Sequence, residues 1–340
     1  MRRLPIYFVL DVSESMVGEN HVRLERGLGT VVRQLRQDPF ALETVFVSVI
    51  AFAGKAKTLR PLLELVDFTP PELPAGGGTA LGKALEHLMA ELESNVTRTT
   101  AEKKGDWRPI VFLMTDGHPT DDPAPAIRRW NERWRGRAHL VAISVGDGAD
   151  ARMLAEVADD VIILEDTGEA GFANCVRWIT QSISVNSRPV ERDAGTQFRS
   201  PDLGISLAKF EPSKSAPARS KFDERFAIFT GRCQRSRAPY LLKYESIAGD
   251  GAGTYKSIGA YALAESFFEL SDAGAATGAV SVTDLIDSAP CPHCGNPDSL
   301  SQCSCGRLLC TDGPGNHTCP WCEQTATFEP GVFGVDRGRG

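Results

Sequence analysis

The sequence predicts a two-domain protein in which a doubly wound α/β domain precedes a small cysteine-rich domain. Apolar runs alternate with amphipathic segments over the first half of the chain, and seven of the nine Cys lie between Cys291 and Cys322. The 340 residues suffice for two domains of about 100 to 200 residues each. With 42% hydrophobic and 24% charged residues, the composition is typical of a folded globular protein.

The alternation of strands and helices begins at the N-terminus. Pro5 to Leu10 is a continuous apolar run, helical spacing follows from Val22 to Leu35, and residues 44–53 are rich in β-branched side chains. Helix, strand, helix, strand, helix, strand and helix are predicted at 81–92, 110–115, 124–134, 140–145, 151–157, 161–164 and 171–185. Such a pattern indicates a mostly parallel sheet covered on both faces, in a domain spanning 1–187.

The second half is predicted to hold a linker and a smaller domain. Prolines scattered among Ser, Lys and Arg mark the linker at 188–222. The second domain, 223–328, begins with a β-rich part at 223–288, where strand-like stretches at 226–229, 240–244, 255–263 and 267–270 predict a small antiparallel unit. Its zinc-binding part, 289–325, has too few apolar residues for a core of its own, so its fold must be stabilised by another interaction.

Charge and hydropathy restrict the location and the partners. The net charge is −7 at pH 7, so the chain as a whole is not a basic polyanion binder, and nucleic acid is not an expected partner. The N-terminal apolar run is too short for a secretory signal, and no run reaches the about 18 to 20 apolar residues of a membrane span. We therefore expect a cytoplasmic protein without membrane contact.

Oxygen-bearing side chains follow several of the predicted strands. Asp11, Ser13 and Ser15 alternate after the first strand, Thr79 follows three glycines, and Asp116 follows the strand at 110–115. Each group alone is typical of a helix cap or a turn. Together, at the edge where parallel strands end, they form a set of oxygen ligands that suits Mg²⁺.

The cysteine cluster predicts zinc. Two C-x-x-C pairs have the spacing that directs both sulfurs at one tetrahedral ion. The candidate ligands are Cys291, Cys294, Cys303, Cys305, Cys310, His317, Cys319 and Cys322. Eight ligands suffice for two closed structural sites, although one zinc with spare thiols is the alternative and the pairing stays open. Cys175 and Cys233 stand apart and are expected to be small buried hydrophobic residues.

The D-x-S-x-S, Gly-Gly-Thr and T-D-G set resembles the metal-ion-dependent adhesion site (MIDAS) of von Willebrand factor A domains, over roughly Met1 to Ser187. The resemblance implies a Rossmann-like fold and metal contacts from Ser13, Ser15 and Thr79. It also implies that Asp11 and Asp116 bind directly or through water. One coordination position is left open for an Asp or Glu of a partner protein.

The segment 231–245 and the cysteines after it resemble the metal-binding C-terminal domain of bacterial TerY proteins. TerY-like proteins belong to tellurite-resistance and stress-response systems, where they are associated with a PPM-type protein phosphatase and a serine/threonine kinase-like protein. The resemblance therefore implies a non-enzymatic adaptor in phosphorylation-linked signalling.

Enzymatic readings find weaker support. Gly77 to Lys83 matches most of a phosphate-binding loop, but Ala84 stands where a Ser or Thr hydroxyl is needed. No G-x-G-x-x-G follows the first strand and no G-x-S-x-G occurs. A metal-dependent hydrolase built on Asp11 and Asp116 is a further alternative.

Two binding alternatives concern the cysteine-rich domain. A RING-like ubiquitin-ligase module is disfavoured because the central Cys-x-His-x-x-Cys is missing. A nucleic-acid-binding zinc module would use Arg232, Arg235, Arg237 and Lys243 on phosphates, although such charge runs are usually solvated faces.

Overall fold

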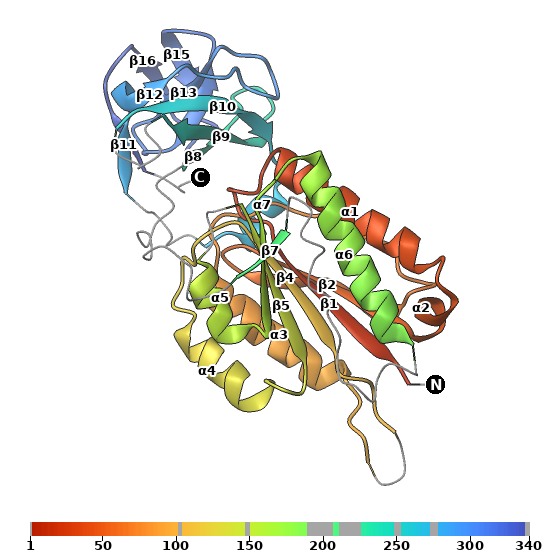
Figure 1. Ribbon diagram of the computed structural model, residues 1–340. Coiled ribbons are helices and arrows are strands. Elements are labelled where there is room, and N and C mark those ends of the chain that lie inside the picture. The colour runs from red at the N-terminus through yellow and green to blue at the C-terminus, as the bar shows by residue number, and fades with distance from the viewer. Residues whose placement is uncertain are drawn as a thin grey trace. The chain divides into compact units, whose positions relative to one another are not determined.

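The computed structural model describes residues 2–100, 104–146, 150–188, 207–210, 226–247, 253–272 and 278–336 (Figure 1). The chain divides into two compact units. One comprises 1–12, 18–73 and 79–219, and the other comprises 13–17, 74–78 and 220–340.

The first unit is built on a seven-stranded sheet with the order β3-β2-β1-β4-β5-β6-β7. Five neighbouring strands pair in parallel, namely β1 (Leu4–Asp11), β2 (Val45–Phe52), β4 (Ile110–Thr115), β5 (His139–Val145) and β6 (Asp160–Leu164). β3 (Ala56–Glu64) and β7 (Leu207–Lys209) add antiparallel edges. The predicted mostly parallel, doubly wound fold is confirmed.

Helices cover both faces of this sheet (Figure 1). One layer contains α1 (Glu19–Leu35), α2 (Pro39–Thr44) and α6 (Glu169–Ser187), and the other contains α3 (Leu81–Asn95), α4 (Ala124–Arg133) and α5 (Ala151–Val157). All eight residues of β1 are buried, as expected for a strand covered on both faces. Within the described residues, no helix is long and apolar enough to cross a bilayer.

Alternate side chains of β1 enter different cores. Tyr7 and Val9 belong to the core shared with α3, α4 and α5. Phe8 stacks on Phe112 of β4 with ring centroids 5.6 Å apart, and Phe112 meets Trp178 of α6 edge-on at 6.3 Å. The period of two in a strand thus distributes large side chains to both layers.

β7 lies inside the segment predicted as a linker. It pairs with β6, so part of that segment extends the sheet. The rest of the predicted linker, apart from Arg188 and Phe210, lies outside the described residues. Neither β3 nor β7 was predicted, because each is an edge strand that is defined by pairing with its neighbour rather than by an apolar pattern of its own.

The second unit contains a six-stranded sheet with the order β12-β10-β9-β8-β14-β13. Its strands are β8 (Phe226–Arg232), β9 (Pro239–Ser246), β10 (Tyr255–Ala262), β12 (Leu285–Ile286), β13 (Asp298–Gln302) and β14 (Leu308–Thr311). β8, β9 and β10 pair antiparallel, as the sequence predicts, and β14 adds to β8 in parallel. Strands from the predicted β-rich and zinc-binding parts therefore share one sheet.

Smaller elements complete the second unit. β11 (Ala279–Ser281) pairs with β17 (Gly334–Asp336), and β15 (Gly315–Thr318) pairs with β16 (Thr325–Phe328). The stretch 267–270, predicted as part of a β unit, lies in helix α7 (Ser266–Leu270), because a five-residue apolar segment does not distinguish helix from strand. A 3₁₀ turn, Val282–Asp284, precedes β12.

Truncating the ring that joins two layers tests this core. We expect Phe112→Ala to destabilise the protein by about 3 to 5 kcal/mol, because it opens a cavity between Phe8 and Trp178. Val66→Ala, at a side chain that is 56% exposed, should change stability by less than about 0.5 kcal/mol. Urea unfolding followed by tryptophan fluorescence measures both variants, and equal losses would contradict the packing described.

Candidate metal centres

Two acidic side chains lie at the ends of neighbouring parallel strands. Asp11 ends β1 with its side chain fully buried, and Asp116 directly follows β4 and is also buried. The Thr115 hydroxyl donates a hydrogen bond of 2.6 Å to Oδ2 of Asp11. Because β1 and β4 pair in parallel, both carboxylates lie at the same edge of the sheet. A buried carboxylate there needs a compensating cation or donors.

The loop carrying Thr79 reaches the same edge. The N–H of Ala80 donates to the Ala53 carbonyl at 2.7 Å, just beyond the end of β2. Since β2 is the other parallel neighbour of β1, Thr79 belongs to the edge that holds Asp11. Its side chain is buried, so the hydroxyl lies within the protein rather than on its rim.

The loop after β1 carries the two predicted serine ligands. The hydroxyl oxygens of Ser13 and Ser15 are 3.0 Å apart. Between them, the Glu14 carboxylate accepts the N–H of Gly78 at 2.5 Å, and Gly78 has a φ of +89° that favours glycine. Glu14 was not predicted to contribute, and its hydrogen bond holds the glycine turn ahead of Thr79.

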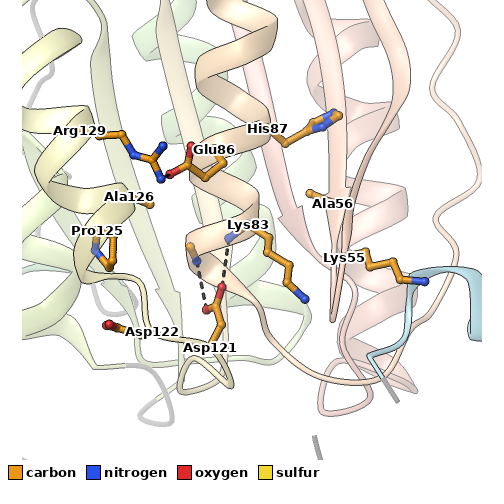
Figure 2. Close-up of a pocket in the computed structure, with 11 residues that line it drawn as sticks. Lys55, Ala56, Lys83, Glu86, His87, Asp121, Asp122, Pro125, Ala126 and Arg129 are labelled. Carbon is orange, nitrogen blue, oxygen red and sulfur yellow. Dashed lines mark hydrogen bonds and ion pairs between the residues drawn. The ribbon is translucent and has the colours of Figure 1, made fainter. Parts of the chain in front are cut away.

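The partial phosphate-loop pattern has a different role. Lys83 lies in the first turn of α3, and its ammonium donates to the Gly54 carbonyl at 3.0 Å. It borders a cleft of about 680 Å³ beside α3 and α4 (Figure 2). Across this cleft Arg129 forms an ion pair with Glu86. Lys83 is thus held by backbone, and Ala84 supplies no hydroxyl for a nucleotide-bound metal.

Eight cysteines of the second unit form two tetrads. The first contains Cys233, Cys291, Cys294 and Cys310, and the second contains Cys303, Cys305, Cys319 and Cys322. Within each tetrad the sulfur atoms lie within 4.8 Å of one another, and none of the eight cysteines forms a disulfide. Four thiols at this separation are suited to one tetrahedral ion, and zinc is the metal that prefers such a set.

Cys233 joins the first tetrad through a backbone turn that three cysteine loops share. In each loop, the N–H of the first cysteine donates to the carbonyl five residues later, and the N–H four residues later donates back, all at 2.9 Å. The loops begin at Cys233, Cys291 and Cys319. In the first of them Ser236 occupies the place of the second cysteine. The C-x-x-S spacing is the sequence signal that could have indicated Cys233.

His317, predicted as a zinc ligand, lies outside both tetrads. Its Nε2 donates to the Gly313 carbonyl at 2.8 Å, and its Nδ1 accepts from the Gln234 amide at 3.1 Å. Gln234 follows Cys233, and its N–H donates to the Cys310 sulfur at 3.3 Å. His317 therefore braces the loop of the first tetrad instead of facing a shared ion.

The thiols of each tetrad differ in acidity. Burial raises the pKa of Cys233, but hydrogen bonds from Ser236, Arg235 and Cys294 together outweigh it and bring the pKa to about 6. Burial likewise raises the pKa of Cys303, but hydrogen bonds from Cys305 and its neighbours lower it to about 7. Burial raises the pKa of Cys319 to about 12. Only a bound cation lets four crowded thiols ionise together, with release of protons.

Three of the four basic residues considered for nucleic-acid binding form contacts within the second unit, and Arg235 is exposed. Arg232 forms a bidentate pair with Glu265 at 2.7 and 2.8 Å, and its guanidinium lies 4.6 Å from the ring centroid of Trp321. Arg237 pairs with an acidic side chain of a cysteine loop, and Lys243 is buried. Arg232 and Lys243 are thus engaged within the protein while Arg235 and Arg237 stay exposed, so the four residues do not form one accessible phosphate-binding face.

Family models match both parts of the chain. The von Willebrand factor type A domain matches residues 6–170, and the TerY-C metal binding domain matches residues 223–340. The chain thus has the TerY-like domain architecture. Both resemblances drawn from the sequence are confirmed, and this pair of domains fits a metal-binding, protein-interaction module.

Solved structures resemble about half of the chain. A von Willebrand factor type A protein from Catenulispora acidiphila is 20% identical, with 54% of this chain and 43% of that chain covered and a TM-score of 0.44. Mussel byssus proximal thread matrix protein 1 with a zinc-occupied MIDAS motif is 20% identical, with 54% of this chain and 48% of that chain covered and a TM-score of 0.40. The pilus adhesin SpaC from Lactobacillus rhamnosus GG is 12% identical, with 55% of this chain and 31% of that chain covered and a TM-score of 0.45. This chain spans less than half the length of each of these proteins.

The zinc content of single variants tests the tetrads. We expect two zinc ions in the purified protein and one in Cys233→Ser, because that substitution removes one of four sulfurs from the first tetrad. His317→Ala should keep both ions. The matched control is Cys175→Ser, since burial raises the pKa of Cys175 to about 12 and no other thiol adjoins it in a tetrad. Native mass spectrometry that showed two ions in Cys233→Ser but one in His317→Ala would contradict the assignment.

Proposed function

We propose that this protein is a non-enzymatic adaptor whose A domain binds a carboxylate of a partner protein through Mg²⁺. Asp11, Ser13, Ser15, Thr79 and Asp116 would hold the ion. The observation that carries the proposal is the placement of two buried carboxylates. Asp11 accepts a hydrogen bond from Thr115, and Asp116 directly follows the parallel neighbouring strand β4. This pair lies within the segment that matches the A-domain family.

The chemistry of the ligand set supports an acidic partner. Two carboxylates balance the charge of a divalent ion, while hydroxyl oxygens complete its coordination without further charge. When bound, the metal would act as a Lewis acid with one open coordination position, which a further carboxylate can fill. The residues of this chain orient the ion and exclude water from Asp11, whereas the incoming acid would come from the partner.

The TerY-C domain would supply the second docking surface. Closed cysteine tetrads leave no position for water, so zinc there would be structural rather than catalytic. Cysteines grouped as metal ligands rather than as disulfides favour a cytoplasmic location. The TerY-like architecture supports a role in tellurite-resistance or stress-response signalling, with a PPM-type protein phosphatase and a serine/threonine kinase-like protein as the proposed partners.

Co-purification tests this function. We expect a phosphatase or kinase-like protein to be retained by the wild type in Mg²⁺ buffer and lost from Thr79→Ala, because the variant lacks a metal-binding hydroxyl. Thr30→Ala is the matched control, because the Thr30 hydroxyl bonds to Arg26 and Arg33 of its own helix, α1. Mg²⁺ is removed by dialysis rather than by chelators, since chelators would also strip zinc. Retention of the same partners by Thr79→Ala would contradict a metal-dependent contact.

A further inference from the structure

The loop after Asp116 is bonded to the backbone of Thr79. The N–H of Thr79 donates to the Thr120 hydroxyl at 3.0 Å, and the N–H of Thr120 donates to the Thr79 carbonyl at 2.9 Å. Both polar groups of the Thr79 backbone are therefore satisfied by one residue 41 positions away. This pair joins the two loops that carry Thr79 and Asp116.

Asp121 adds a second connection at the start of α3. Its two carboxylate oxygens accept the N–H groups of Gly82 and Lys83, each at 3.1 Å (Figure 2). The residue at the helix cap, Ala80, offers no side-chain hydrogen bond. A distant carboxylate thus caps the helix, and its charge suits the positive end of the helix dipole.

Gly82 is required for this contact. A Cβ atom at position 82 would lie 2.8 Å from Oδ2 of Asp121 and 3.2 Å from the Asp122 carbonyl. Any larger residue would displace the carboxylate from the helix end. The glycine of the Gly82-Lys83 pair, which resembles part of a phosphate loop in sequence, instead makes room for Asp121.

We propose that Thr120 and Asp121 are positioning residues that lock the Thr79 loop against the Asp116 loop and so preorganise the metal site. The inference rests on the proposed Mg²⁺ site. The lock acts only through backbone groups of Thr79, Gly82 and Lys83, which leaves the Thr79 hydroxyl available to the ion. Without these hydrogen bonds the Thr79 loop is more flexible. Metal binding must then order the loop, which lowers the metal affinity.

Manganese affinity of the zinc-loaded full chain tests the lock. Mn²⁺ serves as the probe because its free and bound forms are distinguished by electron paramagnetic resonance. Asp121→Ala should weaken Mn²⁺ binding about 10-fold, as outer-shell substitutions at metal sites do. Asp122→Ala is the matched control, since that carboxylate bonds to the N–H of Ala124 and should leave the affinity unchanged. Thr120→Val, which removes the hydroxyl at nearly constant volume, should weaken binding in the same direction if Asp121→Ala folds poorly.

Hydrogen exchange separates the lock from the site. In Asp121→Ala the amides of Gly82 and Lys83 should exchange faster than in the wild type, while the middle of α3 stays protected. A wild type that binds no more Mn²⁺ than Thr79→Ala would overturn the metal site and the lock together. Unchanged Mn²⁺ affinity in Asp121→Ala, despite faster exchange of the two amides, would overturn the lock alone. Unchanged exchange would show that Asp121 does not hold the helix end.

Discussion

Parallel pairing between strands far apart in the chain places ligands of two of the three candidate metal centres, the Mg²⁺ site and the first cysteine tetrad. In the first unit, β1 beside β4 brings Asp11 and Asp116 to one sheet edge. In the second unit, β14 pairs in parallel with β8, with Leu309 opposite Arg232, so the next residues of the two strands are Cys310 and Cys233. These two centres therefore depend on a register that local sequence does not set, and a one-residue slip would turn these side chains to the other face.

The two cysteine tetrads of the second unit differ in how much apolar surface surrounds them. Cys233, Cys291 and Cys310 belong to the same buried cluster as Tyr240 and Phe229, so the first tetrad is also part of the core. The second tetrad packs only with a few neighbours, among them Leu309 and Trp321. Where so little apolar surface is buried, the free energy of metal binding becomes free energy of folding.

The sequence predicts the features that local patterns encode. One short motif at a strand end contains Asp11, Ser13 and Ser15, and the spacing of the C-x-x-C pairs by itself predicts a metal-binding turn. Cys233 could not be assigned in the same way, because its partners lie some sixty residues or more further along and Ser236 interrupts the familiar spacing. His317 has the right chemistry for zinc, but hydrogen bonds to Gln234 and Gly313 occupy its ring.

The edge strands β3 and β7 were not predicted, because a strand at the edge of a sheet needs only one apolar face and is defined by pairing with its neighbour.

Anomalous diffraction from crystals soaked in Mn²⁺, recorded at the zinc and manganese edges, tests the account most directly. The account predicts zinc peaks within the two cysteine tetrads and a manganese peak bounded by Asp11, Ser13, Ser15, Thr79 and Asp116. A zinc peak at His317 would contradict this account, and so would a manganese peak away from the end of the sheet at which β1 and β4 terminate.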